Sequence, residues 1–290
     1  MEIAKILVPV TGSGRDTSLL QYAIETARPF HAHVMAFFVR PDLAEALAFF
    51  SDGASGVVVD EIVKATRDAG DDAARRVEAA ISAACAGAGI SRVKSPVRSG
   101  DVTLSLREVQ GNFGDQLTLE ARLSDLVVFG PMRESDQTGL AEAFVQVLVD
   151  TDRPVLRATD DIPAAAQFAQ RIAVGWDGKK AASLAVTAAI PFLRRAAHVE
   201  IFSIQRPPLT GEATEGLREY LALHGVTATE RLIDAGNKRI GEALLQAAKQ
   251  DSADLLVIGG YGRGRLRESL IGGVTRHVIA HADVAVFMVH

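Results

Sequence analysis

The feature of this sequence that most restricts its fold is an internal repeat. Four segments of the first half have counterparts in the second half, in the same order: 5–12 with 171–178, 33–39 with 198–204, 125–130 with 254–259, and 153–158 with 283–289. Each of these segments is apolar and rich in β-branched or aromatic residues, as strands are. Helical patterns separate them, and such alternation produces parallel sheets covered by helices. The repeat therefore predicts two α/β domains, each Rossmann-like and doubly wound around a mostly parallel five-stranded sheet.

The two halves differ in their connections. Turn residues at 158–163 interrupt the pattern, so we place the first domain at residues 1–162 and the second at 163–290. The first half carries extra residues from about position 41 to position 80, and their Ala-rich, charged pattern predicts a long amphipathic helix. The second half has a shorter counterpart at 211–224.

Composition excludes several classes of protein. The formal net charge of −5 argues against a broad surface for nucleic acid. No uncharged apolar stretch approaches the roughly 20 residues that span a bilayer. The apolar run at 3–10 reads as a first strand rather than a signal peptide. Cys85 is the single cysteine, which fits a reducing compartment. We expect a cytoplasmic protein with no membrane or nucleic-acid partner.

A glycine-dense segment, 259–275, follows the strand-like segment 254–258. Glycines allow backbone N–H groups to approach an anion without obstruction by Cβ atoms. Gly272 and Gly273 lie where a helical pattern begins, and a helix N-terminus offers free N–H donors to phosphate. These two features predict a nucleotide-binding segment.

The repeat and the glycine segment together resemble tandem universal stress proteins over essentially the whole chain. The fingerprint of the ATP-binding members is Gly, two residues, Gly, nine residues, Gly, then Ser or Thr, and Gly259, Gly262 and Gly272 stand at those spacings. Gly273 occupies the Ser/Thr position, which removes one expected hydrogen bond to phosphate. Thr275 could replace that bond in part.

The resemblance implies further contacts with an adenine nucleotide. Asp177 matches the residue that holds the ribose or the adenine edge, and Ile204 matches the one that flanks the base. Gly236 matches a glycine turn close to the nucleotide. From the basic run beside the loop, Arg263 or Arg265 is a candidate to shield phosphate charge, although exposed arginines on a solvated turn are an equally good interpretation. Asp177 is also a candidate helix N-cap. The implied ligand is ATP, AMP or ADP, with or without Mg²⁺.

The first half departs from this fingerprint. Gly130 is kept, but Arg133 replaces the second glycine, and Ala143 and Phe144 replace the Gly-Ser/Thr pair. Thr11 stands in place of the early aspartate. Side chains at these positions should obstruct a triphosphate, so we expect the first domain to pack and pair rather than bind nucleotide.

No catalytic arrangement is evident in the sequence. The Walker pattern is absent, and the dinucleotide pattern Gly-x-Gly-x-x-Gly is not met. His277 and His281 have a spacing that can bind metal, but without a third ligand nearby in the sequence they are better read as surface histidines.

Two functions remain open. The leading hypothesis is a nucleotide-binding stress-response module that is non-catalytic or at most weakly hydrolytic. The alternative is a ligand-free, dimerising interaction protein. The resemblance also implies that the closing strands of the two halves pair within the chain as a pseudo-dimer, and the long helix near residues 60–84 is expected to support a homodimer.

Overall fold

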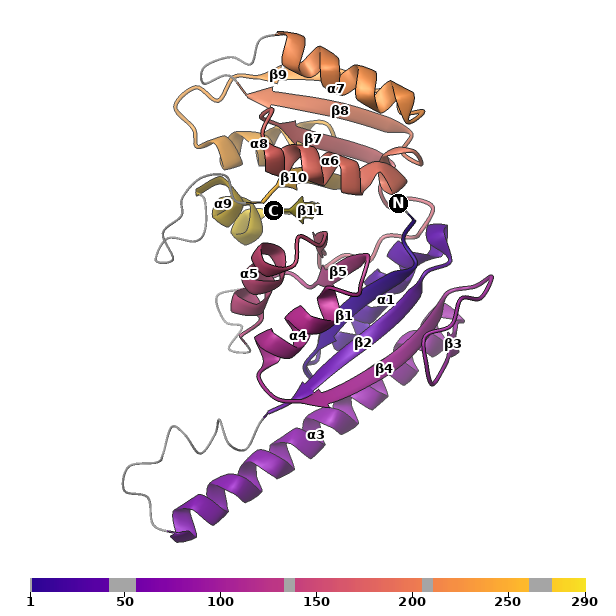
Figure 1. The fold of residues 1–290 in the computed structure, drawn as a ribbon, viewed down its shortest axis with the longest axis vertical. Coiled ribbons are helices and arrows are strands. Elements are labelled where there is room, and N and C mark those ends of the chain that lie inside the picture. The colour runs from indigo at the N-terminus through magenta and orange to yellow at the C-terminus, as the bar shows by residue number, and fades with distance from the viewer. Residues whose placement is uncertain (1, 42–55, 133–138, 205–210, 261–272) are drawn as a thin grey trace. The chain divides into compact units, whose positions relative to one another are not determined.

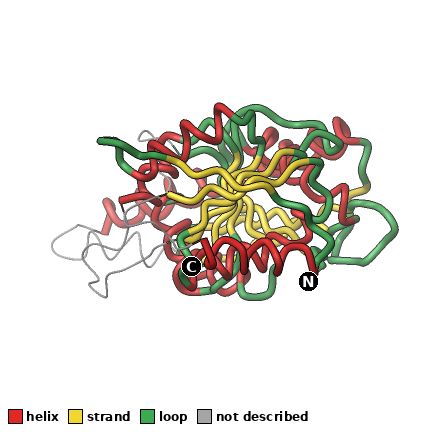
Figure 2. The backbone as a smooth tube through the Cα atoms, turned by 90° about the horizontal axis from the view of Figure 1, so that it is seen from above, coloured by secondary structure: helices red, strands yellow, loops and turns green. Residues whose placement is uncertain are grey.

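The structure is a computed structural model, and it describes residues 2–41, 56–132, 139–204, 211–260 and 273–290. The chain divides into two compact units. The amino-terminal unit consists of Ala4–Phe129 with Glu134–Thr151, and the carboxy-terminal unit of Met1–Ile3, Gly130–Arg133 and Asp152–His290. In each unit, helices pack against the strands (Figures 1 and 2).

The amino-terminal unit contains a sheet of order β3-β4-β2-β1-β5, in which every neighbouring pair is parallel. Its strands are β1 (Lys5–Val10), β2 (His33–Arg40), β3 (Ser91–Arg92), β4 (Thr103–Gln110) and β5 (Leu126–Phe129). Strands β1 and β5 are almost wholly buried, which is why their sequences are continuous apolar runs rather than alternating ones.

The described residues of this unit form the helices α1 (Asp16–Ala27), η1 (Arg28–Phe30, a 3-10 helix), α3 (Gly56–Ala88), α4 (Phe113–Ala121) and α5 (Leu140–Asp150). The 33-residue helix α3 is the long amphipathic helix that the composition predicts. Asn112 caps α4, because its side-chain oxygen accepts a hydrogen bond from Asp115 N at 3.1 Å.

The carboxy-terminal unit contains a sheet of order β6-β11-β10-β7-β8-β9. Its strands are β6 (Val155–Arg157), β7 (Arg171–Trp176), β8 (His198–Ile204), β9 (Thr229–Ile233), β10 (Leu255–Gly259) and β11 (Ala285–Val289). Its helices are α6 (Lys180–Leu193), α7 (Gly211–Leu223), α8 (Ile240–Gln250) and α9 (Gly273–His281). Pairs among β7 to β11 are parallel, and β6 runs antiparallel to β11.

The α/β class with mostly parallel strands is confirmed, but the prediction of two separate five-stranded sheets is not met, because the eleven described strands belong to one hydrogen-bonded sheet. In that sheet β6, the closing strand of the first half, pairs antiparallel with β11 through Leu156 opposite Phe287. Both residues are buried, so this pairing covers an apolar edge that would otherwise be open to association. The pairing of closing strands expected from the resemblance is thus present. It also places residues 152–162 with the second unit, whereas the sequence placed the boundary at 162/163.

The repeat is visible in how the two units begin their sheets. Asp125 Oδ2 accepts hydrogen bonds from the backbone N–H groups of Ala4 and Lys5, both at 2.9 Å. Asp254 accepts in the same way from Gln170 N at 2.9 Å and from Arg171 N. In the first unit the carboxylate before β5 therefore satisfies free amides at the start of β1. In the second unit the carboxylate before β10 does the same at the start of β7.

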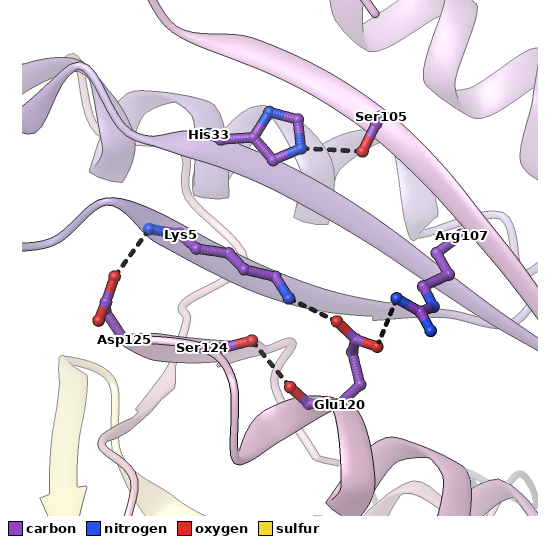
Figure 3. A network of polar contacts seen from close by, with 7 residues as sticks. All are labelled: Lys5, His33, Ser105, Arg107, Glu120, Ser124 and Asp125. Atoms are coloured by element: carbon purple, nitrogen blue, oxygen red, sulfur yellow. Dashed lines mark hydrogen bonds and ion pairs between the residues drawn. The ribbon is translucent and has the colours of Figure 1, made fainter. Parts of the chain in front are cut away.

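A buried polar network lies on the amino-terminal side of the first sheet (Figure 3). The ring nitrogens of His33 lie 2.8 Å from the hydroxyl oxygens of Thr103 and Ser105. Lys5 is paired with the buried carboxylate of Glu120, which also lies 3.2 Å from Arg107 Nη1. Burial, reinforced by the charge of Lys5, lowers the pKa of His33 from 6.5 to about 4. His33 is therefore neutral in the folded protein at pH 7.

Within the described part of the chain, no helix has the length and apolarity needed to cross a membrane.

Candidate functional site

The carboxy-terminal sheet has a switch in its connections between β7 and β10. The chain runs from β7 outward through β8 to β9, and then returns to β10 on the other side of β7. At such a switch the loops after the two neighbouring strands turn in opposite directions and leave a crevice between them. Ligands of open α/β sheets bind in this crevice, outside the carboxyl ends of the strands.

Four of the candidate residues stand at this edge. Asp177 follows β7, Ile204 ends β8, Gly236 follows β9 and Gly259 ends β10. The register shows that the strand ends are level: Trp176 pairs with Ser203, Ile204 with Ile233, and Ile258 with Gly175. The fold therefore brings together four of the residues that the sequence singled out.

Asp177 is exposed and already engaged. One carboxylate oxygen accepts a hydrogen bond from Lys179 N at 3.0 Å, and the other lies 2.6 Å from Lys179 Nζ. Gly178, between them, has a φ of 70°, a conformation that favours glycine. The side chain thus closes the turn that leads into α6, much as an N-cap would. The sequence analysis did not predict that Lys179 pairs with Asp177, although a lysine two residues after an aspartate in a turn was a usable signal.

Gly236 lies in a tight turn after β9. Its φ is 51°, and its backbone N–H donates to Asp234 Oδ1 at 2.8 Å. A Cβ placed on Gly236 would meet nothing within 4 Å, so the turn requires glycine for its backbone angle and not for close packing. Both Gly236 and the half-buried Ile204 remain accessible at the edge of the sheet.

Gly259 has a clear packing role. A Cβ at this position would lie 2.5 Å from Ala182 N and 2.9 Å from Ala181 Cβ. The absence of a side chain therefore lets the start of α6 approach the end of β10 closely. The next residue, Gly260, donates its N–H to Val289 O at 2.7 Å. The first glycine of the fingerprint thus sets the position of α6 relative to the sheet.

The remaining fingerprint positions are only partly described. Gly273 is exposed as the first residue of α9, and a Cβ there would meet nothing within 4 Å. Thr275, two residues later, is buried at 3% exposure, which does not suit it to replace a hydroxyl on the surface of the loop. Gly262, Arg263 and Gly272 lie outside the described residues.

The two histidines of α9 interact with each other. The rings of His277 and His281 stack with centroids 4.3 Å apart, and His281 Nδ1 lies 2.9 Å from His277 O. Burial and the neighbouring His281 lower the pKa of His277. The described residues contain no group of three or more His, Cys, Asp or Glu side chains that could hold a metal ion.

The same edge of the amino-terminal unit is filled by the protein itself. Asp16 is buried, and its carboxylate accepts hydrogen bonds from Thr11 N at 3.1 Å, Gly12 N at 2.7 Å and Ser13 Oγ at 2.7 Å. Burial raises the pKa of Asp16, and these hydrogen bonds partly offset that rise. The backbone N–H groups of Thr11 and Gly12, which follow β1, are therefore taken by an internal carboxylate.

Helix α3 packs against the loop that follows β1, at Gly12. A Cβ on Gly12 would lie 2.8 Å from both Cα and O of Ala73, and Arg76 Nε donates to Gly12 O at 2.7 Å. Further along the edge, Phe144 of α5 is fully buried with its ring centroid 5.1 Å from that of Phe129. These contacts give a physical reason for the divergence of the first repeat. Phe144 was predicted to obstruct the site, whereas Asp16 was missed, although the spacing Ser13-x-x-Asp16 at the start of α1 is that of a capping box and was a usable signal.

The fold and its glycine-bearing edge define a tandem α/β protein with two doubly wound units. Residues 169–290 match the sequence profile of the universal stress protein family. A universal stress protein of Synechocystis is 45% identical over 49 residues, and one from Thermus aquaticus is 38% identical over 79 residues. These matches cover 17% and 27% of this chain, and the chain spans about half of the length of each relative, 45% and 56%.

Solved structures extend the likeness to the complete fold. A universal stress protein from Archaeoglobus fulgidus has a TM-score of 0.67 at 16% identity, covering 99% of this chain and 96% of that one. A protein of unknown function from Pseudomonas aeruginosa has a TM-score of 0.57 at 14% identity, covering 99% and 92%. Residues 169–290 thus match the universal stress protein family by their sequence profile, and the chain as a whole has the fold of the Archaeoglobus fulgidus universal stress protein. The resemblance stated from the sequence is confirmed.

Proposed function

We propose that the carboxy-terminal domain binds an adenine nucleotide, ATP, AMP or ADP, as a stress-response module that is non-catalytic or at most weakly hydrolytic. The observation that carries the proposal is the difference between the two sheet edges. In the carboxy-terminal unit, Asp177 and Gly236 stand exposed at the switch of the sheet. In the amino-terminal unit, Asp16 and α3 occupy the corresponding edge.

Occupancy of this site would act through conformation or through a partner surface. A ligand shifts such an equilibrium only as far as it binds the two states with different affinities. The described residues offer no nucleophile oriented by a base at this edge, so binding itself is the proposed activity.

The test is isothermal titration of the full chain with ATP. The wild type should show saturable binding, and Gly262→Val should weaken it at least tenfold, about 1.4 kcal/mol, because a β-branched side chain would block approach of the phosphates. The matched control is Gly14→Val in the loop between β1 and α1 of the amino-terminal unit, where a Cβ would meet nothing within 4 Å. Gly14→Val should leave ATP binding unchanged. Absence of heat at millimolar ATP would refute the proposal.

The alternative, a ligand-free interaction protein, draws support from the engagement of Asp177 by Lys179. A fresh preparation, denatured and examined for released nucleotide by its absorbance, separates the two functions. Co-purified adenine nucleotide excludes the ligand-free protein.

A further inference from the structure

Helix α3 extends beyond the sheet of its own unit (Figure 1). Residues 71–88 tie it to its own unit through ion pairs of Asp71 with Arg40 at 2.5 Å and Glu78 with Arg92 at 2.6 Å, and through Ala88 O, which accepts from Arg28 Nη2 at 2.6 Å. Arg40 is the last residue of β2, so the sheet ends near the level of Asp71. The amino-terminal half of α3 runs on beyond the ends of β2 and β4 (Figure 1).

The apolar stripe of α3 continues into this projecting half. It follows a heptad register, with small or apolar residues at a and d positions: a at Val63, Gly70, Val77 and Ala84, and d at Val59, Thr66, Ala73 and Ala80. From Gly70 onward the stripe packs largely against the unit, and Val77, Ala80 and Ala84 are buried there. Val59, Val63 and Thr66 are half-buried. A helix with a sustained a/d stripe is built to pack against another helix.

The residues beside the stripe differ between its two flanks. On one flank, at the e positions, stand the exposed and oppositely charged Asp60 and Arg67. On the other flank, at the g positions, stand the apolar Ile62 and Ala69. Charges at e and g set the partner and the orientation of paired helices.

We propose that the projecting half of α3 pairs antiparallel with the same segment of a second copy of this chain. Reversal of one helix brings like flanks together, so Asp60 meets Arg67 of the second copy, and Arg67 meets its Asp60. The apolar g flanks then also face each other and widen the buried stripe. A parallel pair would instead set each e flank against a g flank, leaving both charges opposite Ile62 or Ala69.

The antiparallel arrangement is two-fold symmetric and self-complementary, as closed homodimers require. In this arrangement Val63 lies opposite Thr66 of the second copy, and Thr66 lies opposite its Val63. The layers are few and their side chains small, so the dimer is a reversible one, populated at micromolar to high micromolar chain concentrations.

Sedimentation velocity of the full chain over that concentration range tests the pairing. The wild type should dimerise reversibly. Asp60→Arg and Arg67→Asp should each weaken the dimer roughly tenfold, because each replaces two exposed ion pairs by two repulsions. The double variant Asp60→Arg/Arg67→Asp recreates both pairs with reversed polarity and should recover the wild-type Kd to within about threefold.

Glu61→Lys is the matched control, since Glu61 is exposed at the f position, on the face of α3 opposite the stripe, and should leave the Kd unchanged. Circular dichroism checks that every variant keeps its helix. The proposal is overturned by a wild-type monomer at all concentrations. It is equally overturned by a dimer that ignores the single reversals, or by a double variant no better than the singles.

Discussion

At the scale of single residues, the lysine that follows Asp177 decides how available that carboxylate is. Both oxygens of Asp177 are engaged by Lys179, one by its backbone N–H and one by its ammonium group. Both side chains are about half exposed, at 51% and 52%, so the ion pair is weak. An incoming ribose or adenine group must nevertheless compete with it for the same oxygens.

We therefore predict that Lys179→Met increases the affinity for adenosine by roughly two- to fivefold, the equivalent of an exposed ion pair. The methionine keeps the length of the side chain and removes only its charge. The measurement is isothermal titration with adenosine, which has no phosphate that Lys179 could bind. Lys180→Met, at the next exposed lysine, should have no effect. Equal or weaker adenosine binding by Lys179→Met would show that Lys179 does not compete with the ligand.

At the scale of elements, the packing of α3 on the loop after β1 depends on Gly12. Its φ of 78° disfavours any residue with a Cβ, and a Cβ there would overlap the backbone of Ala73. We predict that Gly12→Ala lowers the free energy of unfolding by more than 2 kcal/mol, since backbone strain of ~1 kcal/mol adds to a steric clash that only movement of α3 can relieve. Urea denaturation measures this change.

Gly89 is the matched control for that experiment. Its φ is 64°, but a Cβ there would meet nothing within 4 Å. Gly89→Ala should therefore cost only the backbone term of ~1 kcal/mol. Similar losses at Gly12 and Gly89 would mean that α3 yields easily and does not hold the loop closed.

The elements also show what could be predicted from the sequence and what could not. Strands such as Leu126–Phe129 and Leu255–Gly259 were predictable because buried parallel strands are continuous apolar runs. Helix α3 was predictable because its apolar periodicity extends over many turns. The spacing Ser13-x-x-Asp16 indicates a capping role for Asp16, but it does not show that the carboxylate also accepts from the loop amides of Thr11 and Gly12. The ion pair of Lys179 likewise depends on how one turn is closed.

At the scale of the whole molecule, the repeat predicted the α/β class, and the resemblance predicted that the closing strands of the two halves pair within the chain. The structure has that pairing, with β6 antiparallel to β11. The sequence did not predict that the strands join into one sheet of eleven, because continuity between sheets depends on tertiary packing and leaves no pattern in the residues.

The stability of the folded chain should depend on pH through His33. Its pKa is about 4 in the folded protein against 6.5 ordinarily, because burial and the charge of Lys5 disfavour the protonated ring. Between pH 6.5 and pH 4 the unfolded chain therefore binds a proton that the folded chain does not. The contribution of neutral His33 is complete above pH 6.5 and is lost as the pH falls toward 4.

We predict that acidification from pH 7 to pH 5 lowers the free energy of unfolding by about 2 kcal/mol through this residue. The lowered pKa of His277 acts in the same direction, whereas the raised pKa values of Asp16 and Asp254 favour the folded state on acidification. Comparison with His33→Gln removes these shared effects, because glutamine keeps polar groups near Thr103 and Ser105 and does not titrate. Urea denaturation of both proteins at the two pH values gives the difference. If wild type and His33→Gln lose equal stability, then His33 accepts its proton without disturbing the hydroxyls around it, and the network is not the acid-sensitive part of the fold.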